Sequence, residues 1–356
     1  MEKYRKFADK FTGINPFLPV FLNKKKKASE VILKLLLGPI LVLIRLPLIL
    51  IFALLLVLYH SIFIHLLVVN SFKRVVTLFN HLVCLRVILF LMGFYKFKTS
   101  FKILSKEGSN KSPPPKMNSG FIVLANHTSP VDYIYMTYLM SPIFSKQYIS
   151  TKDSSQTKVL LSPLSFFQAI KAAFSLDYSI PVQGDDNELA KHHDQKLKVI
   201  SLIQSSFDEH KGPLCIFFEG AKTNGAGFLQ AEESLIQDIA EVQEKYRREV
   251  VVFNLKYTDK SHFSPINTTR NPFLHFILLL TNFSNELKVS AKGIPFQDTT
   301  QTGPLDIKQY KESIYSFYES SGIKKMQVTW REYQKFLDYW QNSQSKQYIE
   351  EIKKRE

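Results

Sequence analysis

Two polar runs, about ninety residues apart, hold the side chains of this 356-residue chain that are best suited to chemistry. The first run reads Asn-His-Thr-Ser-Pro-Val-Asp and covers residues 126–132. A turn within it would let the Asp132 carboxylate bond one ring nitrogen of His127 and fix the tautomer of the imidazole. The other nitrogen would then be able to remove a proton from a hydroxyl group that attacks a carbonyl carbon. The run therefore predicts general-base catalysis by His127, unless Asp132 only caps a helix and His127 only ends a strand.

The second run reads Glu-Gly-Ala-Lys-Thr-Asn-Gly at residues 219–225 and follows a predicted strand. A strand that enters a glycine-containing turn exposes backbone N–H groups, and such turns bind anions. Lys222 adds a positive charge and Thr223 adds a hydroxyl group, which suits a phosphate monoester. An ordinary loop with one lysine is the alternative. The predicted phosphate ligands are Glu219, Gly220, Lys222, Thr223, Asn224 and Gly225.

Apolar strands and amphipathic helices alternate around the two runs. Strands are predicted at residues 121–125, 213–218 and 250–256, and helices at residues 188–211 and 232–248. Ser129 and Pro130 have the character of a helix start, which places Asp132 in the first helical turn. Alternation of this kind predicts an α/β fold with a largely parallel sheet flanked by helices.

A proline-rich hinge, Lys-Ser-Pro-Pro-Pro-Lys at residues 111–116, separates this region from the residues before it. We therefore expect three parts. They are a membrane-embedded N-terminal region at residues 1–110, an α/β domain at residues 117–305 and a polar helical tail at residues 306–356.

Residues 31–69 are overwhelmingly apolar and have basic residues on both sides. About 20 apolar residues span a bilayer, so this stretch is too long for one straight pass and short for two. The basic flanks favour the cytosolic side for both ends. We predict a hairpin that enters and leaves one leaflet, with the Arg45 side chain reaching the headgroups; a single span at residues 46–69 is the alternative. A second apolar helix is expected at about residues 83–94.

The net charge of +15 is concentrated at the N-terminal end. Residues 1–120 hold 19 Lys and Arg against 4 Asp and Glu, and the remaining residues balance at 27 against 27. A nucleic-acid binder normally carries its positive charge on the recognition domain, so this pattern instead indicates an anionic membrane surface as partner. Cys84 and Cys215 lie in apolar contexts, which predicts core residues and favours a reducing, cytosol-facing location.

The first run resembles the signature Asn-His-x-Ser-x-x-Asp of the glycerolipid acyltransferase family, which includes the 1-acyl-sn-glycerol-3-phosphate acyltransferases. The second run, read as Phe-Phe-Glu-Gly-Ala-Lys-Thr-Asn-Gly from residue 217, is similar to the family's Phe-Pro-Glu-Gly-Thr-Arg block. Residues 250–257 resemble a later strand block of the family that usually contains a proline, although a purely structural strand fits them equally well. The resemblance implies His127 as general base, Asp132 as its partner, acyl-CoA as co-substrate, and no metal or prosthetic group.

One departure from the family concerns the acceptor headgroup. Tyr178 stands where the family commonly has an arginine that binds the acceptor phosphate. Lys171 or Lys222 would have to replace it, but an ammonium group lacks the two-pronged geometry of a guanidinium. The departure leaves the identity of the acceptor open more than the type of reaction.

Residues 12–19, Thr-Gly-Ile-Asn-Pro-Phe-Leu-Pro, and the apolar block after them are similar to fungal lysophosphatidic acid acyltransferases of the endoplasmic reticulum and lipid droplets. That resemblance implies acylation of lysophosphatidic acid to phosphatidic acid, with the domain facing the cytosol. Lys353 and Lys354 match a dilysine retrieval signal of the reticulum. The alternatives are another lysophospholipid or glycerol 3-phosphate as acceptor, or a non-catalytic membrane adaptor with the same fold.

Overall fold

The computed structural model describes most of the chain. The described residues are 2–19, 28–102, 119–150, 158–175, 182–184, 198–209, 211–261, 263–296 and 306–353. The predicted hinge at residues 111–116, Tyr178 and Lys354 lie outside them.

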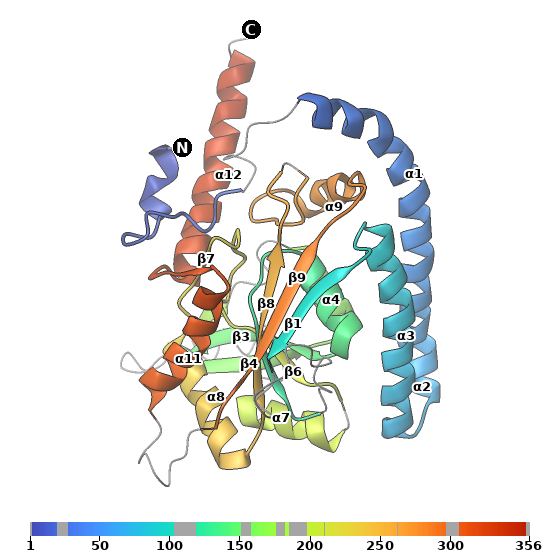
Figure 1. Ribbon diagram of the computed structural model, residues 1–356, viewed down its shortest axis with the longest axis vertical. Helices are drawn as coiled ribbons and strands as arrows, with labels where there is room; N and C mark the ends of the chain where they lie inside the picture. Colours follow the sequence, from blue (N-terminus) through green and yellow to red (C-terminus); the bar gives the residue numbers. More distant parts are fainter. Residues whose placement is uncertain are drawn as a thin grey trace.

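An eight-stranded sheet forms the centre of the molecule (Figure 1). Its strands are β1 (Phe97–Lys102), β2 (Ile122–Ala125), β3 (Ile143–Ser150), β4 (Lys158–Leu164), β5 (Val182–Gly184), β6 (Leu214–Phe217), β8 (Val250–Tyr257) and β9 (Leu287–Ile294). The order is β1-β9-β8-β2-β6-β3-β4, and β5 pairs with β3. Strand β2 runs parallel to both β6 and β8, whereas β4 is antiparallel to β3 and β9 is antiparallel to β8. The predicted α/β fold with a largely parallel sheet is therefore confirmed.

Helices cover both faces of the sheet. They are α1 (Ala28–Leu58), α2 (Ile64–Leu66), α3 (Asn70–Leu91), α4 (Val131–Met140), α5 (Phe166–Ala173), α7 (Val199–Asp208), α8 (Glu233–Tyr246), α9 (Pro272–Leu280), α11 (Ile307–Ser320) and α12 (Trp330–Lys353). One apolar core joins one face of the sheet to α1, α3, α4, α5 and α9, and a second core joins the other face to α7, α8, α11 and α12. A short sheet of β7 (Gly227–Phe228) and β10 (Lys324–Lys325) lies apart from the main one.

The central strands are apolar on both sides because both faces are covered, as is usual for parallel strands between helices. Their register places Ala125, the last residue of β2, beside Phe217 of β6 and Phe253 of β8. The carboxyl ends of β2 and β6 therefore meet at one edge, where the two polar runs follow. This edge is the usual position of a ligand site in an open α/β sheet.

The C-terminal residues 306–353 are helical, as expected, but they are not a peripheral tail. Helices α11 and α12 bury large aromatic side chains, among them Tyr310, Tyr318 and Tyr333, in the core on one face of the sheet. Their polar residues lie on the outer sides, which is why the average composition of this segment gives little sign of its buried stripe.

The N-terminal hairpin has other bounds than predicted. Helix α1 continues through the π-helical turn Tyr59–Phe63 into α2, so residues 28–66 form one arm and α3 forms the other. The prediction of a hairpin within residues 31–69 is therefore wrong, because Pro39 and Pro47 lie inside α1 and do not end it. The apolar helix expected near residues 83–94 is the last part of α3.

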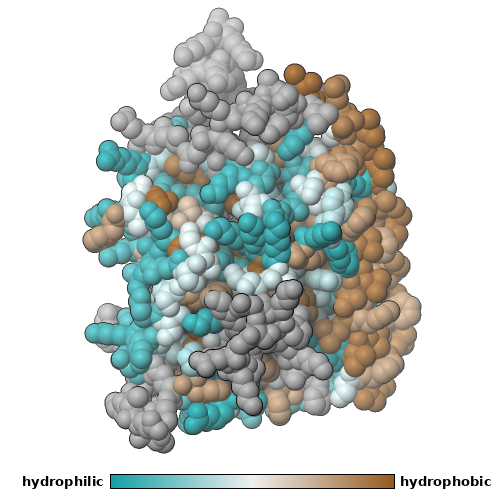
Figure 2. Space-filling model, viewed as in Figure 1, coloured by the Kyte–Doolittle hydropathy of each residue, from teal (hydrophilic) through white to brown (hydrophobic). Residues whose placement is uncertain are grey.

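Both arms are long and apolar enough to cross a membrane, over Leu36–Leu66 and Asn70–Leu91. Figure 2 shows their side chains as a hydrophobic face along one side of the molecule. The largest exposed apolar side chains of α1 and α3 include Leu36, Leu43, Ile44, Leu50, Val75 and Phe79. A face of this size on a protein surface marks contact with lipid or another protein.

Arg45 does not point toward the headgroups, as we expected, but into the protein. Its side chain is only 6% exposed. The guanidinium donates to the carbonyl oxygen of Leu280 at 2.9 Å, to that of Asn282, and to the hydroxyl group of Tyr95 at 3.0 Å. Leu280 ends α9, so the cation lies where a helix has unpaired carbonyl groups and a partial negative charge. Arg45 therefore fastens α1 to the α/β domain.

Replacing Arg45 by Met should lower the free energy of unfolding by roughly 2–4 kcal/mol, because buried carbonyl groups would lose charged donors. Thermal unfolding of the purified protein in detergent measures the change. Leu43→Met, two residues away and 75% exposed, is the matched control and should leave Tm unchanged. Equal Tm values for the two variants would contradict the anchoring role of Arg45.

Candidate active site

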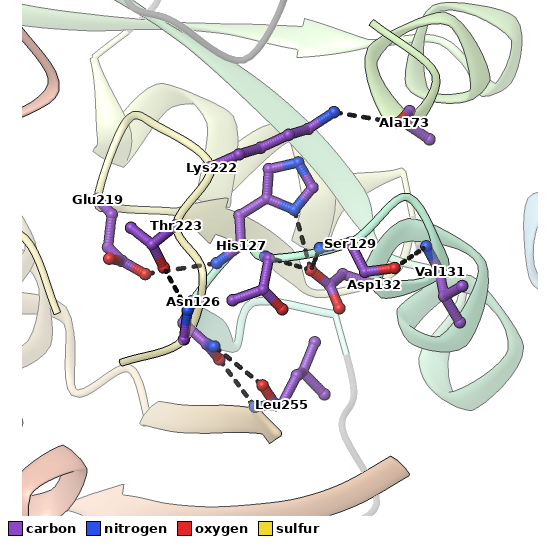
Figure 3. Close-up of polar contacts among 12 residues, drawn as sticks. Asn126, His127, Ser129, Val131, Asp132, Ala173, Glu219, Lys222, Thr223 and Leu255 are labelled. Carbon is purple, nitrogen blue, oxygen red and sulfur yellow. Dashed lines mark hydrogen bonds and ion pairs between the residues drawn. The ribbon is translucent and has the colours of Figure 1, made fainter. Parts of the chain in front are cut away.

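The turn between β2 and α4 brings His127 and Asp132 together (Figure 3). His127 Nδ1 lies 3.0 Å from Asp132 Oδ2. Pro130 already has helical dihedral angles, and the hydroxyl oxygen of Ser129 accepts the N–H of Val131 at 3.1 Å. The helix start predicted from the sequence thus bends the chain back, so that residues five apart share a hydrogen bond.

Asp132 is fully buried and has a complete set of donors. Besides the His127 ring, Oδ2 accepts the backbone N–H groups of Thr128 at 2.7 Å and Ser129 at 2.8 Å. Oδ1 accepts the hydroxyl group of Tyr257 at 2.6 Å. Hydrogen bonds to the charged form favour a carboxylate and offset the free-energy cost of its burial. The pair is therefore built to keep Asp132 as an acceptor and Nδ1 of His127 as the protonated nitrogen.

The His127 ring is enclosed by aromatic side chains. It stacks on Phe217 with 4.6 Å between ring centroids and meets Tyr133 edge-on at 5.3 Å. Burial lowers the pKa of His127 to about 4, against the smaller raising effect of Asp132. Nε2 has no hydrogen-bond partner among the described residues. At neutral pH the ring is therefore uncharged, with an unused basic nitrogen.

Glu219 and Thr223 join the second run to the first at the end of β6. The backbone N–H of Thr223 donates to the carbonyl oxygen of His127 at 3.0 Å. The carboxyl group of Glu219 accepts the N–H groups of His127 at 3.4 Å and Leu229 at 3.1 Å. Burial raises the pKa of Glu219 to about 8. The structure therefore places Glu219 behind the His127 backbone, where it positions the turn.

Lys222 extends past the imidazole of His127 and is fully buried (Figure 3). Its ammonium group donates to the carbonyl oxygens of Ala173, at 3.2 Å, and Ser175, at the end of α5. Its positive charge lowers the pKa of His127. Lys222 therefore brings a cation to the side of the ring that carries Nε2.

Two glycines shape the turn around Lys222. Gly220 and Gly225 have φ values of +67° and +71°, a region that L side chains rarely adopt. The nearest atom that a Cβ on Gly225 would meet is the methyl group of Thr128, at 3.7 Å. The two runs thus lie in contact, as the prediction of a shared site requires.

Asn224 holds an N-terminal segment, residues 12–18, against the turn. Its backbone N–H donates to the carbonyl oxygen of Pro16 at 2.7 Å, and its side-chain amide donates to those of Asn15 and Leu18, both at 2.9 Å. Both side-chain donors of Asn224 are used in this way. The structure therefore gives Asn224 a part in fixing the turn, while its contact with a substrate stays a prediction.

Strand β8 supplies contacts that the sequence did not reveal. Besides Tyr257, which bonds Asp132, Leu255 exchanges two hydrogen bonds with the side chain of Asn126, at 2.7 and 3.0 Å. The only signal in the sequence is that residues 250–257 resemble a strand block of the acyltransferases. The block in fact reaches the site through Tyr257.

An apolar cavity of about 320 Å³ lies between the N-terminal arms and the site. It begins beside Tyr133, whose ring contacts His127, and Ala173, which accepts a bond from Lys222. Its other lining residues come from α1, α3, α4, α5 and α9 and include Ala53, Leu85, Ile134, Phe166, Ile170 and Phe276. The cavity is apolar enough for an alkyl chain, and the Tyr133 ring lies between it and the imidazole.

Part of the chain is similar in sequence to one known protein family. Residues 102–253 match the model of a family described as Acyltransferase. No curated protein matches the chain. The matched residues begin at the end of β1, reach into β8, and contain both polar runs of the site. The chain therefore carries an acyltransferase domain within residues 102–253.

Proposed function

We propose that the protein is a membrane-bound enzyme that transfers the acyl group of acyl-CoA to the free hydroxyl group of lysophosphatidic acid. The products are phosphatidic acid and free CoA. The observation that carries the proposal is the buried pair of His127 and Asp132, with Nε2 of the ring unbonded among the described residues, inside an acyltransferase domain.

His127 acts as the general base. Nε2 takes the proton of the acceptor hydroxyl while its oxygen attacks the thioester carbonyl carbon, and the carbon–sulfur bond then breaks. The imidazolium returns the proton to the departing thiolate, so that CoA leaves as a thiol. Asp132 stabilises the imidazolium, and Tyr257 holds Asp132 in place.

The turn at residues 219–225 receives the phosphate of the acceptor. Lys222 supports this assignment, because it brings a buried positive charge beside the reacting nitrogen. An anion bound there would lie close to His127. Because the His127 ring is neutral, it would not compete with Lys222 for the anion. Glu219 and Asn224 contribute by fixing the turn through their hydrogen bonds to neighbouring segments.

The apolar parts of the substrates contact the N-terminal arms. The acyl chain enters the 320 Å³ cavity, and the acceptor reaches the site from the membrane in which the arms lie. We further propose that this membrane is that of the endoplasmic reticulum and lipid droplets, with the domain on the cytosolic side. The excess of Lys and Arg in residues 1–120 supports an anionic membrane surface as partner.

His127→Ala should reduce acyl transfer by roughly 100-fold to 10,000-fold, the usual contribution of a general base, without releasing the protein from membranes. Formation of radiolabelled phosphatidic acid by purified protein measures the first effect, and membrane flotation measures the second. The control is His65→Ala on α2, which should keep full activity. Full activity in the His127 variant would contradict the mechanism.

An acceptor panel with other lysophospholipids and glycerol 3-phosphate, run on the wild type, tests the identity of the acceptor.

Lys222→Met should raise the KM for lysophosphatidic acid more than that for acyl-CoA, because the turn loses its cation. It should also raise the pKa of His127, since the positive charge that disfavours the imidazolium is gone. In the wild type, kcat/KM should fall only as the pH approaches 4, and in the variant this acid limb should move to higher pH. The control is the exposed Lys211→Met. If the acid limb of kcat/KM did not move and only the KM for acyl-CoA changed, the assignment of Lys222 to the acceptor phosphate would be refuted.

Ala53→Phe should shorten the acyl chain that the enzyme prefers, because the added ring occupies the cavity between α1 and the site. Excluding two methylene groups loses about 0.8 kcal/mol each, so the ratio of kcat/KM for oleoyl-CoA to that for lauroyl-CoA should fall about tenfold. Leu54→Phe, next to it and 56% exposed, should leave the ratio unchanged. The same ratio in both variants would show that the cavity does not hold the chain.

A further inference from the structure

A second cavity, of about 760 Å³, lies on the opposite face of the sheet from α4. Its floor is formed by β1, β9 and β8, and one wall is formed by the last turns of α11. In the view of Figure 1 these strands lie at the front, and Figure 2 shows hydrophilic surface over part of them. The site proposed above uses none of the residues that line this groove.

The pairing register arranges lysines in a row across the three strands. Lys288 of β9 lies directly opposite Lys98 of β1 on one side and Lys256 of β8 on the other. Lys292, four residues on, lies on the same face of β9 and also lines the groove. Like charges directly opposite one another across strands are destabilising. This face of the sheet therefore carries an electrostatic cost that a bound anion would offset.

A row of neutral donors follows the lysine row. Ser290 of β9 lies opposite Ser100 of β1 and Asn254 of β8. Hydroxyl groups also come from α11, at Ser316 and Ser320. Cations flanked by hydroxyl and amide groups are the surroundings in which proteins bind phosphate oxygens.

Asn254 shows that the groove is more than a charged surface. Its side chain is only 1% exposed, yet its amide oxygen has no hydrogen-bond partner among the described residues. A buried amide oxygen without a donor costs free energy. The oxygen and nitrogen of an amide are assigned from the hydrogen-bond network, and the reversed assignment turns the N–H groups to the same position. Asn254 lines the groove, and with the amide reversed its N–H groups would pair with an acceptor such as a phosphate oxygen there.

The nearby charges leave the groove positive. None of the described residues that line it is acidic. Glu286 forms an ion pair with Lys98, and the ammonium of Lys256 donates to the carbonyl oxygen of Ser321 at 2.9 Å. The charge of Lys288 also lowers the pKa of Glu286, so this one carboxylate is shared between two lysines, and the four lysines that line the groove leave it positive.

We infer that this groove binds the phosphate groups of a ligand with two or more negative charges. Lys288 and Lys292 supply the charge, and Ser290 and Asn254 supply the neutral donors between them. The groove is separate from the acceptor-phosphate turn, because Asn254 and Lys256 point to one face of β8 while Tyr257, which bonds Asp132, points to the other. A ligand in the groove and a substrate at His127 can be bound together.

Calorimetric titration of the full-length protein in detergent with inorganic pyrophosphate tests the inference. The double variant Lys288→Ala/Lys292→Ala should bind pyrophosphate at least about tenfold more weakly than the wild type, since two charge-assisted contacts are lost. Asn254→Leu, which keeps the charge and the volume, should weaken binding about threefold or more. Lys308→Ala/Lys324→Ala removes the same charge outside the groove and should bind like the wild type.

Lys222→Met separates this site from the proposed active site. It removes the cation from the turn at residues 219–225 and should leave unchanged the pyrophosphate binding that depends on Lys288 and Lys292. Loss of binding in that variant, with retention in the double groove variant, would overturn the inference. Equal weakening by the groove and control double variants would also overturn it, because binding would then follow net charge alone.

Titrations in nanodiscs identify the source of the phosphate. Nanodiscs of phosphatidylcholine alone are compared with nanodiscs that also contain phosphatidic acid. Weaker pyrophosphate binding in the second kind, absent in the double groove variant, would support the groove and assign it to a lipid headgroup. Equal affinity in both kinds would support it as a site for a soluble phosphate ester.

Discussion

The burial of the Asp132 carboxylate is the constraint on which the site depends. A carboxylate removed from water is stable only when donors surround it. Here the donors are the His127 ring, the backbone of Thr128 and Ser129, and the hydroxyl group of Tyr257. They come from one turn and from a strand that begins 118 positions after Asp132. The turn, the helix start and the pairing of β2 with β8 must all be correct before the charge is satisfied, and the same contacts orient the imidazole.

Features that depend on local rules could be predicted from the sequence. Alternating apolar strands and helices indicated the parallel sheet, and a turn between residues five positions apart indicated the pair of His127 and Asp132. Contacts between distant segments were out of reach, because a pattern along the chain does not say which remote backbone group a side chain will meet. Tyr257 on Asp132, Arg45 on the end of α9, and the N-terminal segment on Asn224 are all of this kind. The hairpin bounds were missed for a different reason, since prolines inside an apolar helix need not end it.

Strand β8 separates two chemical environments by the alternation of its side chains. Leu255 and Tyr257 face the core beside the buried pair of His127 and Asp132, whereas Asn254 and Lys256 face the basic groove. The apolar arms lie on the first side only. One strand therefore has the apolar core and the buried His127–Asp132 pair on one side and a polar, positively charged surface on the other. A shift of its register by one residue would exchange the two sets and abolish both.

The N-terminal segment that holds Asn224 is itself packed on the far end of the chain. Phe17 is fully buried against Tyr333 and Phe336 of α12, with ring centroids 5.2 and 5.6 Å apart. The turn at residues 219–225 is thus connected to α12 through this segment, so that loosening the aromatic contact would disturb the turn without changing either polar run.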